Sequence, residues 1–260
     1  MKTYLDKNVY EAALERIAYC FQEFDNVLVA FSGGKDSGVL LNLCYNYADE
    51  HGLLDKLTMY HLDYEAQYQM TTEYVTRTFL EQFPGIRKMW YCVPIKAQSA
   101  CALGEPYWTP WDAAKKKLWV RAMPENPYVV HEGNLDVPFR HGMVDYEFQD
   151  KLSRHFAKKR GTTAVMVGLR ADESLNRYAA VARGKKRRSY EGRKWITQTS
   201  AVTANVYPLY DWRVSDIWTA TARFGFDYNR LYDLLYQAGL TAGQMRVASP
   251  FNDCAQESLK

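Results

Sequence analysis

Residues 26–52 read NVLVAFSGGKDSGVLLNLCYNYADEHG, and this stretch decides the fold. Residues 26–32 are apolar nearly throughout, as a strand buried on both faces of a parallel sheet would be. The small and charged residues SGGKDS follow at 32–37. After them, apolar side chains recur at helical spacing, at Val39, Leu40, Leu43, Cys44 and Tyr47. The stretch therefore predicts a strand, a loop and a helix that stops near Gly52.

The same alternation continues along the chain. Helices are predicted over residues 7–24, 68–83, 144–160 and 171–183, with two more around Val214 and Leu231. Strands are predicted over residues 56–63, 87–95, 162–170 and 205–209. Strands that alternate with helices form parallel βαβ units, so the predicted fold class is α/β, with a Rossmann-like parallel sheet flanked by helices.

Residues 96–143 break this rhythm with several prolines and with four aromatic residues, Tyr107, Trp108, Trp111 and Trp119. The segment is too long to be a plain loop in a compact domain, which predicts a functional insertion. Its rings can stack on nucleic-acid bases or on a purine ring, or they can pack as a lid over the core. The lid is the favoured interpretation.

The composition excludes several classes of protein. The first twenty residues carry too many charges for a signal peptide, and no apolar run approaches the length of a membrane span. The five cysteines are scattered and form no CxxC pair, which argues against a disulfide framework and against an iron–sulfur cluster. A reducing cytoplasm is the expected location.

The SGGKDS loop is typical of an anion site. A glycine-rich turn before a helix presents backbone N–H groups beside the positive end of the helix dipole, where phosphate binds. The loop lacks the Walker A pattern, since Val29 stands at the first glycine position and Asp36 follows the lysine. It is not GxGxxG either, because Gly33 and Gly34 are adjacent. Asp36 would repel phosphate unless a cation lies between them, which predicts Mg²⁺ carried in with a polyphosphate. The alternative is a helix start at which Asp36 or Ser37 is only a cap.

These residues resemble the signature of the PP-loop family, the ATP α-hydrolases that include the phosphoadenosine phosphosulfate (PAPS) reductases. HLDYEAQYQMTTEYV at 61–75 resembles that family's second strand and the helix after it, although residues 70–73 lack the usual proline. VGLRADESLNR at 167–177 resembles its GxRxxESxxR segment, and YPLYDWRVSDIW at 207–218 resembles its PLxDWxxxDIW run. The resemblance covers about residues 20–240 and implies a Rossmann-like fold of the adenine nucleotide α-hydrolase (HUP) type.

The resemblance also implies the residues of the site. The loop would clamp pyrophosphate with Ser32, Gly33, Gly34, Lys35, Asp36 and Ser37. Asp63 would lie near the adenosine of ATP or PAPS. Gly168 and Arg170 would end another strand on the same rim. Arg170 and Arg177 would offer cationic forks to phosphate or sulfate, and Glu173 would hold one of them or the metal. Lys35, Asp36 and Arg170 are the implied catalytic residues, with Asp36 as the Mg²⁺ ligand.

One nucleotide-binding domain is therefore expected over residues 1–240, with the insertion at about 96–143 and a C-terminal tail over 241–260. No linker rich in Gly, Ser or Pro divides the chain. The tail ends without a capping element, which leaves open whether a further C-terminal portion completes the site.

Two chemistries fit this scaffold. In the first, a nucleophile attacks the α-phosphorus of ATP, pyrophosphate leaves into the loop, and an unknown acceptor is adenylated. In the second, a cysteine thiolate attacks the sulfur of PAPS. The sequence favours the first, because Cys254 in NDCAQES lacks the Glu-Cys-Gly-type surroundings of the reductases.

A non-catalytic subunit that uses ATP as a switch is a third alternative. Within the reductase-like branch, the sequence resembles prophage-associated regulators of the IbrA type, which are often encoded beside a ParB-like partner. Seven of the twelve residues at 183–194 are cationic, among them Lys185, Lys186, Arg187 and Arg188. This cluster predicts either a contact with nucleic acid or a solvated loop. A homodimer is left open.

Overall fold

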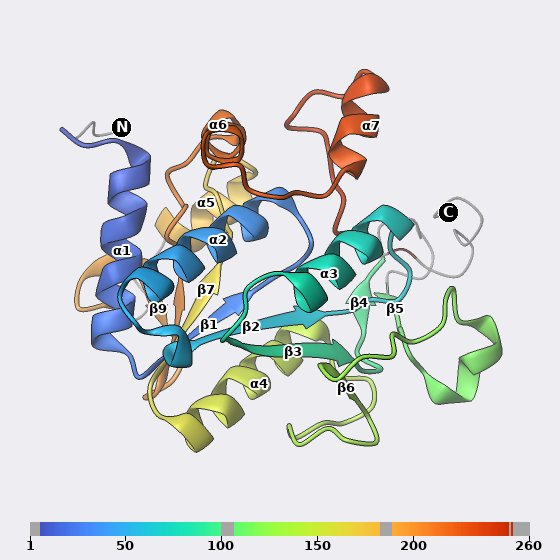
Figure 1. Ribbon diagram of the computed structural model, residues 1–260. Helices are drawn as coiled ribbons and strands as arrows, with labels where there is room; N and C mark the ends of the chain where they lie inside the picture. The colour runs from blue at the N-terminus through green and yellow to red at the C-terminus, as the bar shows by residue number, and fades with distance from the viewer. Residues whose placement is uncertain (1–5, 100–106, 183–188, 250, 252–260) are drawn as a thin grey trace.

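The structure, a computed structural model, describes residues 6–99, 107–182, 189–249 and 251 (Figure 1). Its centre is an eight-stranded sheet in the order β6-β3-β2-β1-β7-β10-β9-β8. Six of these strands are parallel, namely β1 (Asn26–Ala30), β2 (Leu57–Leu62), β3 (Arg87–Cys92), β6 (Val129–His131), β7 (Thr163–Val167) and β10 (Thr203–Val206). The predicted α/β fold with a parallel sheet is confirmed.

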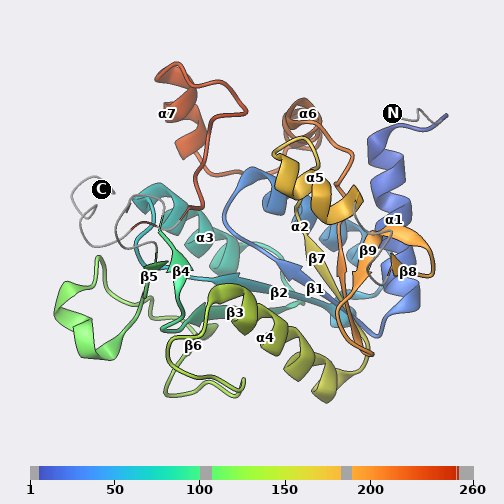
Figure 2. The ribbon, with the colours of Figure 1, turned by 180° about the vertical axis from the view of Figure 1, so that it is seen from behind.

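Helices cover both faces of the sheet. They are α1 (Val9–Glu23), α2 (Lys35–Glu50), α3 (Gln69–Glu81), α4 (Asp145–Arg160), α5 (Leu175–Ala182), α6 (Val214–Phe224) and α7 (Leu231–Gln237). Figures 1 and 2 show α2 and α3 on one face and α4 on the opposite face. Within the described ranges, no helix combines the length and the apolar composition that crossing a membrane requires.

The apolar residues of β1 explain why the sheet is buried on both sides. Val27 and Val29 point into the larger core cluster, which α1, α2 and α3 complete. Leu28 points the other way, into a second cluster with Phe148 and Leu152 of α4. All three β1 side chains are fully buried, as the continuous apolar run predicts.

The sheet edges differ from the sequence prediction. Next to β10, the edge of the sheet consists of two antiparallel strands, β9 (Arg193–Gln198) and β8 (Ser189–Tyr190). The basic stretch 183–194 includes β8 and the first two residues of β9. The insertion supplies β6 to the other edge of the sheet. It also forms a separate small antiparallel pair, β4 (Ala97–Gln98) and β5 (Tyr107–Trp108), and a 3-10 segment, Ala113–Leu118. A second 3-10 turn, Leu54–Lys56, precedes β2. These pieces are too short, or too polar, to show a period in the sequence.

The strand order places a switch point between β1 and β7. From β1 the chain builds β2, β3 and β6 in one direction, and α4 then returns it to β7 on the other side of β1. In open α/β sheets, ligands bind outside the carboxyl ends of the strands at such a point. The SGGKDS loop follows β1 and therefore lies at this place.

Candidate functional site

The glycine-rich loop has a shape that small residues allow. β1 ends at Ala30 and α2 begins at Lys35, with Gly34 in the position before the first helical turn. Gly33 has a φ of +79°, a conformation that favours glycine. A Cβ on Gly33 would also lie 2.9 Å from Cγ2 of Val75 on α3. The loop therefore turns tightly against α3, as only glycine permits.

Two serine side chains fasten the loop. The Ser37 hydroxyl donates to the Gly34 carbonyl at 3.0 Å and accepts from the backbone N–H of Ser32 at 3.2 Å. The hydroxyl oxygens of Ser32 and Ser37 are 3.0 Å apart. The loop that was expected to bind pyrophosphate is therefore held in its conformation by hydrogen bonds among its own residues.

Asp36 lies between two cations. Lys35 Nζ is 3.1 Å from Asp36 Oδ2, and the Arg170 guanidinium donates to Asp36 Oδ1. Arg170 also pairs with Asp172 and, at 3.4 Å, with Glu173. Its side chain is only 3% exposed and lies behind Asp36. Arg170 therefore pairs with the carboxylates around it and does not line the cavity. The contact with phosphate or sulfate that the family resemblance implies stays a prediction.

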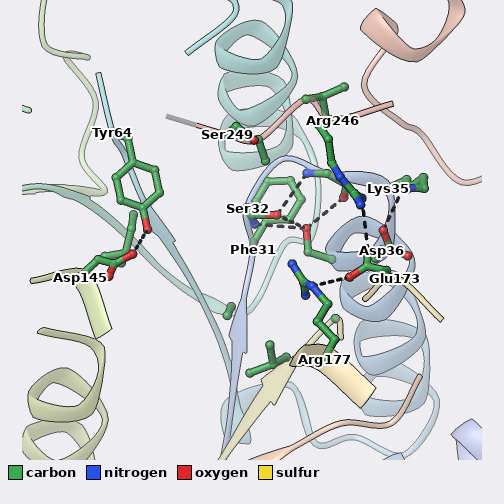
Figure 3. A pocket seen from close by; sticks show the side chains of 18 of the residues that line it. Phe31, Ser32, Lys35, Asp36, Tyr64, Asp145, Glu173, Arg177, Arg246 and Ser249 are labelled. Atoms are coloured by element: carbon green, nitrogen blue, oxygen red, sulfur yellow. Dashed lines mark hydrogen bonds and ion pairs between the residues drawn. The ribbon is translucent and has the colours of Figure 1, made fainter. Parts of the chain in front are cut away.

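Glu173 holds two further arginines at the same end of the site. Arg177 Nε is 2.6 Å from Glu173 Oε2, and Arg246 Nη1 is 3.8 Å from Oε1. The Glu173 side chain is 6% exposed, whereas the two arginines are about half exposed. Figure 3 shows Arg177, Arg246 and Lys35 beside the loop. A buried carboxylate thus fixes two guanidinium groups where they can meet an anion.

A cavity of about 440 Å³ opens at the carboxyl ends of β1, β2 and β7. Eight residues expected from the sequence line it, namely Ser32, Gly34, Lys35, Asp36, Ser37, Gly168, Glu173 and Arg177. Apolar residues that line it include Ala30, Phe31, Leu62 and Val167 from the strand ends and Met245, Val247 and Ala248 from the C-terminal side. A volume of this size suits a small molecule such as a nucleotide. Gly33, Asp63 and Arg170 are the three expected residues that do not line it.

The Asp63 carboxylate contacts the insertion instead of the cavity. It accepts from Trp90 Nε1 at 2.7 Å and from Arg121 Nη2 at 2.5 Å. Burial alone would raise the pKa of Asp63, but the charge of Arg121 and the hydrogen bonds hold it below its ordinary value. Asp63 therefore stays ionised and anchors residue 121 to the end of β2. Its place near the adenosine, which the family resemblance implies, stays a prediction.

The aromatic residues of the insertion pack inward in part. Trp111 is 2% exposed and forms an edge-to-face pair with Trp119 at 5.2 Å between ring centroids. The buried carboxylate of Glu65 accepts from the backbone N–H groups of Trp111 and Val120, both at 2.7 Å. These two rings are packed against the core, which favours the lid over base stacking for this part of the insertion.

Metal binding was predicted at Asp36. Within the described ranges, no group of three or more His, Cys, Asp or Glu side chains could hold a metal ion. Asp36 lines the cavity, yet both of its oxygens face cations. A Mg²⁺ ion at Asp36 would therefore need most of its ligands from phosphate and water, which is common for this ion.

Some residues predicted from the sequence have no structural description. Cys101, Cys254 and the basic residues Lys185, Lys186, Arg187 and Arg188 lie outside the described residues. Cys20, Cys44 and Cys92 are described and buried, and burial raises the pKa of each thiol.

Sequence reasoning missed the C-terminal side of the cavity. The Tyr232 hydroxyl on α7 accepts from the Lys35 backbone N–H at 3.2 Å, and Lys35 Nζ lies 5.2 Å from the Tyr232 ring centroid. Arg246 lines the cavity from the stretch Met245–Ser249, which the sequence assigned to a tail. The sequence signal that could have revealed this wall is the position of Arg246 between two apolar residues, Met245 and Val247. Both of these neighbours are buried, and they hold the segment in place.

Residues from α4 and its surroundings were missed as well. Asp145 and Gln149 line the cavity from the first two turns of α4, together with Tyr60, Tyr64 and Gln98. Residues 144–160 were predicted as a helix from their apolar face, which carries no information about a ligand. Their place in the cavity follows from the topology, which brings the start of α4 to the carboxyl ends of β1 and β7.

Comparison with known proteins identifies relatives of the chain. The sequence model of the family described as phosphoadenosine phosphosulfate reductase domain matches residues 26–238. The uncharacterized protein YbdN of Escherichia coli K12 is 34% identical over 258 residues, or 98% of this chain. The chain spans 62% of the length of that relative.

Two solved structures align with most of the chain. PAPS reductase from Candida auris is 15% identical, with a TM-score of 0.48, and the match covers 90% of this chain and 93% of that one. Candida glabrata FMN adenylyltransferase, in complex with FAD and inorganic pyrophosphate, is 14% identical, with a TM-score of 0.48. That match covers 88% of this chain and 64% of the other.

Proposed function

The chain belongs to the phosphoadenosine phosphosulfate reductase domain family, and we propose that it binds ATP and cleaves it between the α and β phosphates. The products are pyrophosphate and an adenylated acceptor, or AMP where water is the acceptor. The observation that carries this proposal is the cationic end of the cavity. There, Lys35 of the SGGKDS loop lies on the same side of the cavity as Arg177 and Arg246.

Charge and position would supply most of the catalysis. When the nucleophile attacks the α-phosphorus, the bond to the bridging oxygen breaks and pyrophosphate takes the electron pair. Lys35 and the loop amides would stabilise the charge that develops on this leaving group. The proposed role of Arg170 is indirect, because it fixes Asp36 and Glu173 from behind.

Magnesium would arrive on the phosphates in this proposal. Asp36 follows the loop glycines in sequence and lines the cavity, so its carboxylate would provide one ligand to the magnesium ion. The ion would neutralise charge on the polyphosphate. Asp36 would hold the ion, and Lys35, which pairs with Asp36 at 3.1 Å and also lines the cavity, would supply positive charge beside the phosphates.

The alternative of sulfonucleotide reduction needs a reactive thiolate. In the described part of the chain, the thiols of Cys20, Cys44 and Cys92 are buried and their pKa values are raised, so none suits this role. A reductase would therefore have to use Cys101 or Cys254, which lie outside the described residues. We retain ATP as the proposed substrate, because a pyrophosphate leaving group suits the intact SGGKDS loop.

The test is to incubate the protein with ATP and Mg²⁺ and to separate the nucleotides formed. AMP and pyrophosphate in equal amounts would support the proposal, with or without an added acceptor. ADP and phosphate would contradict it, since the bond cut would be the wrong one. Binding of ATP with no turnover would favour a regulatory subunit, and release of sulfite from PAPS would favour the reductase.

A further inference from the structure

The cavity has a second polar end, away from the loop. Tyr60, Tyr64, Asp145 and Gln149 line it there, with the two tyrosines on or just after β2 and the other two on α4. Figure 3 shows Tyr64 and Asp145 on the opposite side of the cavity from Lys35 and Arg177. The proposed function explains the cationic end and leaves this end unassigned.

Both tyrosines fix a side chain of α4. The Tyr64 hydroxyl donates to Asp145 Oδ2 at 3.3 Å, and the Tyr60 hydroxyl donates to Gln149 Oε1 at 3.0 Å. Burial raises the pKa of both tyrosines, so both phenols remain protonated donors. Because Tyr60 occupies the Gln149 oxygen, the amide NH₂ of Gln149 is the group that remains to meet a ligand.

The two side chains therefore present complementary hydrogen-bonding groups. A carboxylate accepts hydrogen bonds, and an amide NH₂ donates them. Asp145 accepts from the backbone N–H of Tyr146 at Oδ1 and from Tyr64 at Oδ2, and each of these oxygens has a second lone pair for a ligand. Asp145 and Gln149 are four residues apart on one helix, so they lie on the same face, one turn from each other. Beside them, Leu62 and Val167 give the cavity apolar surface on which a flat ring can pack.

We propose that Asp145 and Gln149 determine specificity for the adenine base, with Asp145 accepting from the 6-amino group and Gln149 donating to an adjacent ring nitrogen. This inference rests on the proposed binding of an adenine nucleotide with its phosphates at the loop. A base with oxygen at position 6, as in inosine or guanosine, places an acceptor against the Asp145 carboxylate. The two acceptors repel each other, and the carboxylate loses a hydrogen-bond partner.

The test compares ATP with inosine triphosphate, in which a carbonyl replaces the 6-amino group and N1 carries a hydrogen. We expect the wild-type protein to bind ATP about tenfold more tightly, because one hydrogen bond to a charged group is at stake. Asp145→Ala should weaken ATP binding, because the hydrogen bond is lost, and should not weaken inosine triphosphate binding, because the repulsion is removed, so that the two affinities converge. Glu147→Ala is the matched control, since Glu147 stands in the same helical turn and pairs with Arg140 and Lys151 outside the cavity.

The outcomes separate this inference from the proposed function. Equal wild-type affinities for ATP and inosine triphosphate would overturn the inference even if AMP and pyrophosphate are formed, and this comparison needs no variant to fold. Tighter binding of GTP than of ATP would overturn it as well. If no nucleoside triphosphate binds, the proposed function fails and the inference fails with it. Discrimination that persists in Asp145→Ala would assign the specificity to other residues.

Discussion

Gly168 and Asp36 lie in direct backbone contact, since a Cβ placed on Gly168 would be 3.0 Å from the carbonyl carbon of Asp36. The same Cβ would lie 2.9 Å from the backbone nitrogen of Ser37. The glycine after β7 thus supports the first turn of α2 from the neighbouring strand. The atoms it meets are backbone atoms, which cannot rotate away as a side chain can.

Gly168→Ala should displace the SGGKDS loop. We expect the free energy of unfolding to fall by about 1–3 kcal/mol, as in other overpacked sites. We also expect ATP affinity to fall about tenfold, measured by titration calorimetry. Gly243→Ala is the control, because a Cβ there meets no atom within 4 Å. Wild-type affinity in Gly168→Ala would show that the loop does not depend on this contact.

Lys35→Met should separate binding from chemistry. The Lys35 side chain is 3% exposed and lines the cavity, and methionine retains most of its apolar stem. We expect AMP formation to fall about 100- to 1000-fold, the usual loss when one group that stabilises a transition-state charge is removed. The measurement is single-turnover ATP cleavage, with Lys115→Met as an exposed-lysine control. Unchanged cleavage by the Lys35 variant would remove this lysine from the mechanism.

The sequence predicted the loop well because its chemistry is local. A buried strand, two glycines and a helix start lie within a dozen residues, and each leaves a pattern. The long-range contacts could not be predicted in this way. The contact of Arg170 with Asp36 and that of Asp63 with Arg121 join residues more than fifty positions apart. The periodicity of a strand does not predict which partner a charged side chain at its end contacts, so the pairing of Asp63 with Arg121 left no pattern in the sequence.

Glu65 should make the stability of the insertion depend on pH. Burial raises the pKa of Glu65 to about 7, although the N–H groups of Trp111 and Val120 favour its ionised form. Between about pH 4.5 and pH 7 the folded chain therefore holds a proton that the unfolded chain releases. The contribution of Glu65 to the free energy of unfolding is thus highest below this window and is lost as the pH rises through it.

Glu65→Gln should remove this dependence. Relative to the variant, the wild-type protein should lose on the order of 2–3 kcal/mol between pH 5 and pH 8, measured by denaturant unfolding. Glu50→Gln removes the same charge from an exposed site on α2 and controls for net charge. A constant difference between wild type and Glu65→Gln over this range would mean that Glu65 is ionised throughout.

Thr71 couples the C-terminal side of the cavity to the loop. Its hydroxyl donates to the Val247 carbonyl at 2.8 Å and accepts from Asn229 Nδ2 at 2.9 Å, while the same Asn229 amide lies 3.3 Å from the Gly33 carbonyl. Thr71 and Asn229 are fully buried, so neither can turn to water instead. The stretch that carries Arg246 is therefore fastened to the phosphate loop through one hydroxyl.

Thr71→Val keeps the shape of this side chain and removes the hydroxyl. The Val247 carbonyl and the Asn229 amide each lose a partner, which should lower the free energy of unfolding by about 1–3 kcal/mol. ATP affinity should fall with it, because residues 245–249 form one wall of the cavity. Thr71→Ser retains the hydroxyl and should bind ATP with the wild-type affinity, although it lacks the Thr71 methyl group that lies beside Gly33. If Thr71→Val and Thr71→Ser bind ATP equally, the hydroxyl does not hold this wall and the packing of Met245 and Val247 alone must do so.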